Sequence, residues 1–125
     1  MLIAYWITAA ILAFVYLLAG GMKLIRPKDK LVAAGQGWAE NVSPVVVKLV
    51  GLVEVFGALG VILPGLVPGA PTVLAPLAAI GLVLVQAVAI GVHLRRGEAK
   101  VLLVNIILLI LALAVAWLGA AVFVQ

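Results

Sequence analysis

Polar and ionisable side chains that interrupt long apolar runs are the residues of this sequence with the greatest potential for chemistry. Glu54 lies near the middle of the apolar run at residues 45–63, VVVKLVGLVEVFGALGVIL, and is the only acidic residue inside such a run. An ionisable side chain in hydrocarbon costs about 2.5 kcal/mol or more, which makes it a functional-site hypothesis by default. A proton or ligand role would suit it. The other candidate ligand-binding residues are Tyr16, Lys23, Gln86, His93 and Asn105.

A structural role is the alternative for Glu54 and for the two amide side chains. Glu54 would then be protonated, because burial disfavours its charged form, and would hydrogen-bond to Gln86 or Tyr16. Gln86 and Asn105 would serve as hydrogen-bond bridges between membrane helices. Small residues on the helical face of Glu54 would let a neighbouring backbone approach closely. These small residues are Gly51, Gly57 and Ala58.

The basic residues and the histidine also have structural alternatives. His93 would be solvated or would interact with the negative end of its helix. Lys48 lies about 120° around its helix from Glu54, so a direct salt bridge between the two is not expected. Basic side chains beside the apolar runs would anchor the chain at lipid headgroups and set its topology. The residues with this alternative role are Lys23, Arg95 and Arg96.

Several classes of chemistry lack the residues that they need. The chain has no cysteine, which excludes disulfides, thiolate metal sites and thiol redox chemistry of its own. A single histidine does not build a zinc or haem site within one chain. The sequence has no Gly-rich phosphate loop, no HExxH and no serine nucleophile motif. No catalytic residue is therefore assigned, and catalysis by this chain alone is not expected.

The composition indicates which elements must position these side chains. Hydrophobic residues make up 68% of the 125 residues, whereas a soluble domain is about 45–50% apolar. We predict an all-α integral membrane four-helix bundle in the lipid bilayer, with a single domain over residues 1–125. The net charge of +4 does not indicate nucleic-acid binding, because the basic residues flank apolar runs. The expected spans are residues 2–22, 45–63, 72–94 and 101–124.

The distribution of basic residues predicts the orientation of the bundle. Four spans place both termini on one side, and all eight Lys and Arg residues belong to the other side. The positive-inside rule then makes loops 23–44 and 95–100 cytoplasmic and both termini extracytoplasmic, in the plasma (inner) membrane of a bacterium. Within the first loop, residues 31–38 would form a short interfacial helix. Pro64 is expected to end the second span.

Helix geometry brings the polar side chains to similar depths. Measured from the basic side, Glu54 lies roughly 13 Å deep and Gln86 roughly 12 Å deep. Tyr16 lies roughly 9 Å and Asn105 roughly 6 Å from that side. His93 and Lys23 lie near the mouth. These depths predict a polar recess that opens toward the basic side, while the opposite half of the bundle is apolar.

Three stretches of the chain resemble the DoxX-like family of small four-span membrane proteins. They are GGMKL at residues 20–24, GLVEVFGALG followed by LP within residues 51–64, and HLRRGE at residues 93–98. The resemblance implies that Lys23, Glu54 and His93 are the family's span-one lysine, span-two carboxylate and span-three histidine. It implies that relatives act as partners in membrane oxidoreductase assemblies or in oxidative-stress defence. Distant relatives resemble assembly chaperones for membrane receptors. It carries no agreed catalytic assignment.

Three functions remain open on the sequence. The first is an accessory protein whose recess holds the head of a quinone or lipid and which associates with a membrane oxidoreductase. The second is an assembly factor or scaffold for other membrane proteins, or a homo-oligomer, packing through small-residue faces. The third is a proton-coupled small-molecule transporter that uses Glu54. The small-residue faces consist of Gly51, Gly57, Gly60, Ala87, Gly91, Ala112, Ala116 and Ala120.

Overall fold

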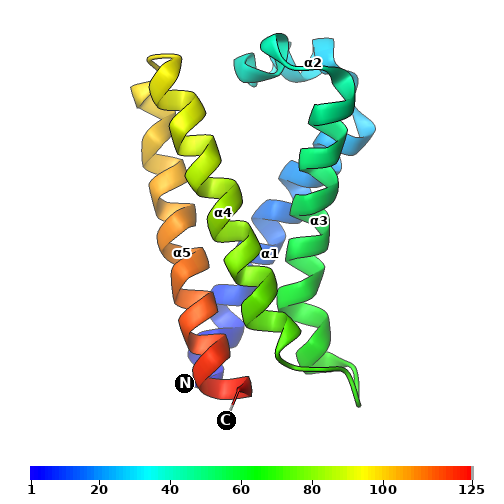
Figure 1. Ribbon diagram of the computed structural model, residues 1–125, viewed down its shortest axis with the longest axis vertical. Helices are drawn as coiled ribbons and strands as arrows, with labels where there is room; N and C mark the ends of the chain where they lie inside the picture. Colours follow the sequence, from blue (N-terminus) through cyan, green and yellow to red (C-terminus); the bar gives the residue numbers. More distant parts are fainter. Residues whose placement is uncertain (125) are drawn as a thin grey trace.

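The computed structural model describes residues 1–124, which form helices and connecting loops without any strand (Figure 1). Four of the helices have 22 to 25 residues and are long and apolar enough to cross a membrane. At a rise of 1.5 Å per residue they measure about 33–38 Å. The all-α architecture with four candidate spans is therefore confirmed. The helices are α1 (Leu2–Ile25), α2 (Lys28–Ala33), η1 (Gly37–Asn41), α3 (Pro44–Leu66), α4 (Leu74–Arg95) and α5 (Ala99–Phe123).

The four long helices form a ring in which each packs against two others. α1 and α4 both contact α3 and α5, and neighbouring helices run antiparallel (Figure 1). The start of α1, the α3–α4 turn and the end of α5 lie at one end of the bundle, here called the termini end. α2, η1 and the α4–α5 turn lie at the other end, here called the loop end. The side of the membrane that each end faces stays a prediction.

The long helices extend beyond the boundaries expected from hydropathy in most places. α3 begins at Pro44, and the hydroxyl of Ser43 accepts a hydrogen bond from the Val46 amide at 3.3 Å. The expectation that Pro64 ends this helix was wrong, because α3 continues to Leu66 with Pro64 inside it. A proline removes one amide donor. The next turn still forms, with the Val67 amide donating to Leu63 at 2.9 Å.

The segment between α1 and α3 consists of two short helices instead of the single interfacial helix expected over residues 31–38. Gly35 separates α2 from η1 and has a φ of +98°, a left-handed conformation that glycine adopts without steric cost. Leu31, Ala39 and Val47 are buried together, so this segment packs against the start of α3. The Lys48 ammonium donates to the carbonyl of Leu24 at 2.6 Å, which ties α3 to the last turn of α1.

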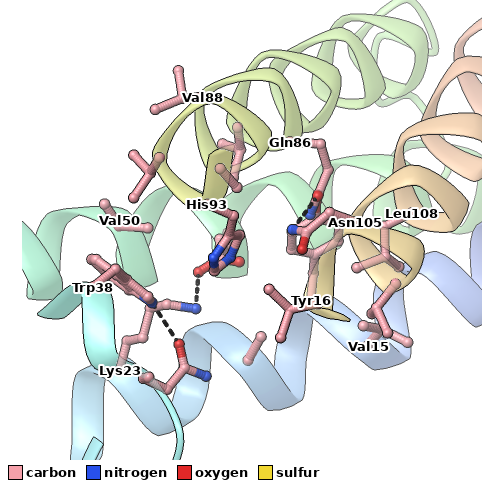
Figure 2. A pocket seen from close by; sticks show the side chains of 18 of the residues that line it. Val15, Tyr16, Lys23, Trp38, Val50, Gln86, Val88, His93, Asn105 and Leu108 are labelled. Atoms are coloured by element: carbon pink, nitrogen blue, oxygen red, sulfur yellow. Dashed lines mark hydrogen bonds and ion pairs between the residues drawn. The ribbon is translucent and has the colours of Figure 1, made fainter. Parts of the chain in front are cut away.

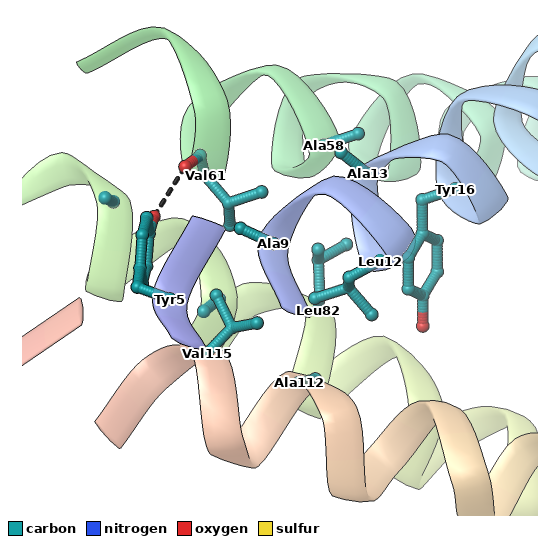
Figure 3. Packing of buried hydrophobic residues seen from close by; sticks show 12 residues of the cluster. Tyr5, Ala9, Leu12, Ala13, Tyr16, Ala58, Val61, Leu82, Ala112 and Val115 are labelled. Carbon is teal, nitrogen blue, oxygen red and sulfur yellow. Dashed lines mark hydrogen bonds between the residues drawn. The ribbon is translucent and has the colours of Figure 1, made fainter. Parts of the chain in front are cut away.

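The apolar core occupies the termini end and the middle of the bundle (Figure 3). Tyr5 is fully buried, and its hydroxyl donates to the carbonyl of Val61 on α3. The ring of Phe123 packs edge-on against Tyr5, with ring centroids 4.9 Å apart. Alanines at the helix contacts let the backbones come close. The buried alanines of this core are Ala9, Ala13, Ala58, Ala75, Ala79 and Ala112.

Candidate functional site

A pocket of about 400 Å³ lies near the loop end, between the four long helices. Every long helix contributes lining residues, and the loop around Gln36 and Trp38 contributes more (Figure 2). The structure brings all six candidate residues from the sequence to the wall of this one pocket. They are Tyr16 and Lys23 on α1, Glu54 on α3, Gln86 and His93 on α4, and Asn105 on α5.

Two glycines set the distance between the helices that carry the charged pair. A β-carbon on Gly20 would lie 2.7 Å from the carbonyl oxygen of Gly51, and one on Gly51 would lie 2.8 Å from the carbonyl oxygen of Gly20. No side chain fits at either position, so α1 and α3 cross with their backbones nearly in contact. Lys23 and Glu54 each lie three residues beyond one of these glycines. The crossing therefore places the two charged side chains against each other's helix.

Lys23 and Glu54 form a buried ion pair. Their Nζ and Oε1 atoms are 2.7 Å apart, and the side chains are 8% and 5% exposed. Oε1 has no directed hydrogen bond within residues 1–124, so charge attraction holds the pair. The interpretation of Lys23 as a headgroup anchor was wrong, and so was the expected hydrogen bond from Glu54 to Gln86 or Tyr16. The Gly20–Gly51 crossing explains the pairing with Lys23, because it brings the last turns of α1 against Glu54, while Tyr16 and Gln86 hydrogen-bond to each other.

Trp38 covers the lysine from the loop side. The Lys23 ammonium lies 5.9 Å from the centroid of the Trp38 ring, within the range of a cation–π interaction. The indole nitrogen donates to Oε1 of Gln36 at 2.8 Å (Figure 2). Gln36 and Trp38 therefore close one side of the pocket. The sequence predicted Trp38 in the interfacial helix over residues 31–38, and neither it nor Gln36 was among the predicted site residues.

A chain of three hydrogen-bonding side chains crosses the deeper part of the pocket. Nδ2 of Asn105 donates to Oε1 of Gln86 at 2.9 Å, and Nε2 of Gln86 donates to the hydroxyl of Tyr16. The chain links α5, α4 and α1, and both Gln86 and Tyr16 are buried. The predicted bridging role of the two amides is present. A hydroxyl that accepts a hydrogen bond retains its own hydrogen for donation, and the three residues also line the pocket.

His93 is held at the mouth by a residue that sequence reasoning missed, Glu98. Nδ1 of His93 and Nε of Arg96 each lie 3.0 Å from Oε1 of Glu98. The hydrogen bond with His93, together with the charge of Arg96, holds the pKa of Glu98 below its usual range. The turn explains this geometry: Gly97 has a φ of +69°, and the Glu98 amide donates to the His93 carbonyl at 2.9 Å. This is the glycine-dependent helix ending that returns the chain over the last turn.

The α4–α5 turn also touches the loop that closes the pocket. A β-carbon on Gly37 would lie 2.9 Å from Nη2 of Arg96, so the arginine occupies the space that a side chain at residue 37 would need. Glu98 binds Nε of the same guanidinium at 3.0 Å. Arg96 was interpreted from the sequence as a topology anchor. In the structure its guanidinium lies beside Gly37 and so connects the α4–α5 turn to η1.

The remaining walls of the pocket are apolar and partly open to the outside of the bundle. Val88 on α4 is 68% exposed and Val104 on α5 is 60% exposed, although both line the pocket. In a bilayer these openings would face acyl chains. Residues 1–124 contain no group of three or more His, Cys, Asp or Glu side chains arranged to hold a metal ion. The arrangement is suited to binding a molecule with a polar head and an apolar body.

Comparison with known proteins identifies the family. A family model described as DoxX-like matches residues 7–115, a range that contains all six candidate residues. No curated protein matches the chain, and no solved structure matches it. The match confirms the resemblance drawn from the three sequence stretches. The chain belongs to the DoxX-like family.

Proposed function

We propose that this protein is an intramembrane binding protein that holds the head of a quinone or lipid-like molecule in the pocket between its four helices. The observation that carries the proposal is the convergence of polar side chains from all four long helices on one pocket of about 400 Å³. Small-molecule pockets have volumes of about 300–1,000 Å³ and combine apolar walls with a few placed polar groups. The apolar body of the ligand would leave between the helices, past Val88 or Val104.

The buried charges support a binding role over a purely structural one. Replacing a buried ion pair by well-packed apolar residues is often neutral or stabilising, so packing alone does not account for Lys23 and Glu54. Both side chains line the pocket, where an oxygen-bearing head would interact with the lysine ammonium. A quinone fits this requirement, since its carbonyl oxygens accept hydrogen bonds. No residue in the pocket is arranged as a nucleophile with its base, which favours holding the molecule over transforming it.

A protein that binds a quinone without transforming it would serve as an accessory to an enzyme that does. A quinone held between helices that are open to lipid would be presented to a membrane oxidoreductase, and the protein would be an accessory component of that system. We infer this association from the family resemblance and from the chemistry of the pocket together. The inner membrane of a bacterium is the proposed location, on the basis of the basic loops at residues 23–44 and 95–100.

The test is mass spectrometry of small molecules that co-purify with the protein. Wild type is compared with Glu54→Gln and with Gly21→Ala, a control at a helical glycine that has open space around it. We expect a quinone or lipid with wild type and Gly21→Ala and its loss from Glu54→Gln. Retention by all three proteins would remove Glu54 from the site. No retained molecule in any folded protein would contradict the proposal.

An assembly role is the second candidate, and the position of the small residues decides which surface it would use. Gly57 and Gly60 pack against Leu82 and Ala78 inside the bundle, so they are not available to partners. Ala87, Gly91 and Ala120 are exposed and would let a partner helix approach. Affinity purification in mild detergent tests this role. A stoichiometric partner that is lost with Gly91→Leu would support it, and its absence would leave the binding role alone.

A further inference from the structure

The second ring nitrogen of His93 is an unused hydrogen-bond acceptor. Nδ1 faces Oε1 of Glu98, and a carboxylate only accepts hydrogen bonds, so Nδ1 carries the hydrogen. In the neutral imidazole, Nε2 is then unprotonated and accepts. Arg96 keeps the carboxylate oriented and ionised, which fixes this tautomer. Nε2 makes no hydrogen bond within residues 1–124, and His93 lines the pocket, so Nε2 is the ring nitrogen that remains for a ligand there (Figure 2).

The deep end of the pocket offers the opposite hydrogen-bonding character. The Tyr16 hydroxyl accepts from Gln86, whose own oxygen is occupied by Asn105. The hydroxyl hydrogen of Tyr16 is therefore available to a ligand oxygen. Tyr16 is almost fully buried, so this donor has no access to bulk solvent apart from the pocket. The pocket thus presents a donor at its deep end and an acceptor at its mouth.

The two residues of α4 that hold these ends are spaced by about the length of a small aromatic ring with its two hydrogen bonds. Gln86, which holds Tyr16, and His93 are seven residues apart on α4, about 10.5 Å along the helix axis. A six-membered ring with oxygens at opposite corners, with a hydrogen bond of about 2.8 Å at each end, spans about 11 Å. The Lys23–Glu54 pair lies in the same pocket and is neutral overall, so it does not demand a charged head.

From these three observations we propose that the pocket selects a head that donates a hydroxyl hydrogen to His93, and that it binds a para-hydroquinone in preference to the corresponding quinone. Tyr16 donates to one ring oxygen in both forms. At the other end, a hydroquinone hydroxyl donates to Nε2 of His93, whereas a quinone carbonyl oxygen meets the lone pair of that nitrogen. This inference rests on the proposed binding function and adds to it the chemical form of the ligand and the roles of Tyr16 and His93.

The size of the preference follows from a single hydrogen bond. One such bond, set against the repulsion of two acceptors, corresponds to about a tenfold difference in Kd between the two forms. Tighter binding of the reduced form raises the midpoint potential of the bound couple. For a two-electron couple, a tenfold preference corresponds to about +30 mV. No electron transfer by the protein itself is implied, because the protein only distinguishes two forms that other enzymes interconvert.

The experiment compares three ligands that share one alkyl chain: the para-hydroquinone, the para-benzoquinone and the para-dimethoxybenzene. Kd is measured for the full chain in detergent micelles, without oxygen, at one fixed pH of about 8. The variants are Tyr16→Phe, His93→Leu and Glu98→Gln. Arg95→Gln is the control, since this substitution changes the charge near the same turn at a residue that does not line the pocket. A monoacylglycerol serves as a competing hydroxyl-bearing lipid.

Wild type and Arg95→Gln should bind the hydroquinone about tenfold more tightly than the quinone and the dimethoxy compound. Tyr16→Phe should weaken the binding of the hydroquinone and of the quinone to a similar extent. His93→Leu should weaken the binding of the hydroquinone only, and its Kd should rise to that of the quinone. Glu98→Gln, which changes an exposed turn, should reduce the preference in a chain that still folds. Displacement of the hydroquinone by the monoacylglycerol, dependent on His93, would support hydroxyl selection with a lipid as the source.

The failures of the two proposals are distinguishable. If the hydroquinone and the quinone bind equally well to wild type, or if the quinone binds more tightly, hydroxyl selection is overturned while the binding function stands. A preference that survives in both His93→Leu and Glu98→Gln would also overturn it, because the acceptor would then lie elsewhere. If none of the ring compounds and no monoacylglycerol binds, the proposed binding function itself fails.

Discussion

Two pockets of nearly equal volume lie at opposite ends of this bundle, and they differ in chemistry. The pocket at the loop end has a volume of about 400 Å³, and a second pocket of about 390 Å³ lies near the α3–α4 turn. The second pocket has no hydrogen-bonding side chain in its lining. Volume therefore does not distinguish the two ends of the molecule, whereas the convergence of buried polar groups does, and it supports the loop end as the proposed site. The residues lining the second pocket are Phe56, Leu59, Gly60, Leu63, Pro64, Val67, Ala70 and Leu74.

Removing one half of the ion pair at the loop end should cause the largest loss of unfolding free energy. In Lys23→Met the carboxylate of Glu54 loses its partner in a buried position, which should cost about 3–5 kcal/mol of unfolding free energy. The double variant Lys23→Met/Glu54→Met should recover most of this loss, because no unpaired charge remains. Thermal unfolding in detergent measures both. A single variant as stable as wild type would mean that the pair is solvated and not buried.

A side chain at the helix crossing should have the next largest effect. In Gly51→Ala the new β-carbon would meet the backbone of Gly20 at 2.8 Å, and the backbone is not free to yield. Overpacking of this kind costs about 1–3 kcal/mol. Gly21→Ala is the matched control, since nothing lies within 4 Å of its β-carbon, and it should be neutral or slightly stabilising. Equal effects of the two substitutions on the unfolding free energy would contradict the close approach of α1 and α3.

Filling each pocket separately tests whether only one of them binds. Ala89→Phe places a ring in the polar pocket and should raise the Kd of the co-purifying ligand about tenfold or more. A tenfold change corresponds to about 1.4 kcal/mol of binding free energy. Ala70→Phe fills the apolar pocket and should leave the Kd unchanged. Isothermal titration or competition binding provides the measurement. Loss of affinity in Ala70→Phe and not in Ala89→Phe would move the ligand to the other end of the bundle.

Two buried tyrosines on α1 allow a finer comparison of the ends. Tyr5→Phe removes the hydroxyl that donates to the Val61 carbonyl, and Tyr16→Phe removes the hydroxyl that accepts from Gln86. Each change should lower the unfolding free energy by about 1 kcal/mol, the typical net value of a hydrogen bond. Only Tyr16→Phe should also weaken ligand binding. If Tyr5→Phe lost ligand binding while Tyr16→Phe bound as wild type does, the ligand would be assigned to the termini end instead.

The smallest expected effect is a pH dependence of the α4–α5 turn. The pKa of Glu98 lies below its usual range because of His93 and then Arg96, so ionised Glu98 stabilises the folded turn above the ordinary glutamate pKa of about 4.3. This contribution is lost as pH falls through the lower pKa of the folded state. Hydrogen exchange of the residue 98 amide, corrected for intrinsic rates, should be slower in wild type than in Glu98→Gln at about pH 6, and the difference should shrink as the pH is lowered. Identical exchange in the two proteins throughout would rule out the interaction.

Hydropathy and helix rise were sufficient to predict the four long helices and the group of polar residues near one end. Glu54 and Gln86 are predicted at similar depths because each lies a similar number of residues from the edge of an apolar run. The pairing of Lys23 with Glu54 was not predictable in this way. It depends on the distance between α1 and α3, which the Gly20–Gly51 contact determines, and helix periodicity on one chain segment carries no information on that distance.

The remaining differences arise from the backbone of the turns. Glu98 reaches His93 because Gly97 reverses the chain at the end of α4, and the spacing of the two residues in the sequence does not indicate that contact. The loop around Trp38 closes the pocket because Gly35 divides α2 from η1. The conformation of such turns depends on single glycine dihedrals. The glycines are visible in the sequence, but the side chains that they bring together are not.

The Lys23–Glu54 pair has a consequence for the biogenesis of the protein. The two partners belong to different spans and are separated by a polar loop, so each leaves the ribosome without the other. A span with a lone carboxylate enters a membrane at a cost of about 2.5–3.5 kcal/mol, and α3 bears that cost until α1 is beside it. The first two spans are therefore expected to insert as a hairpin, with the glycine crossing already formed. The order of synthesis suits this requirement, since Lys23 is already in place when Glu54 emerges.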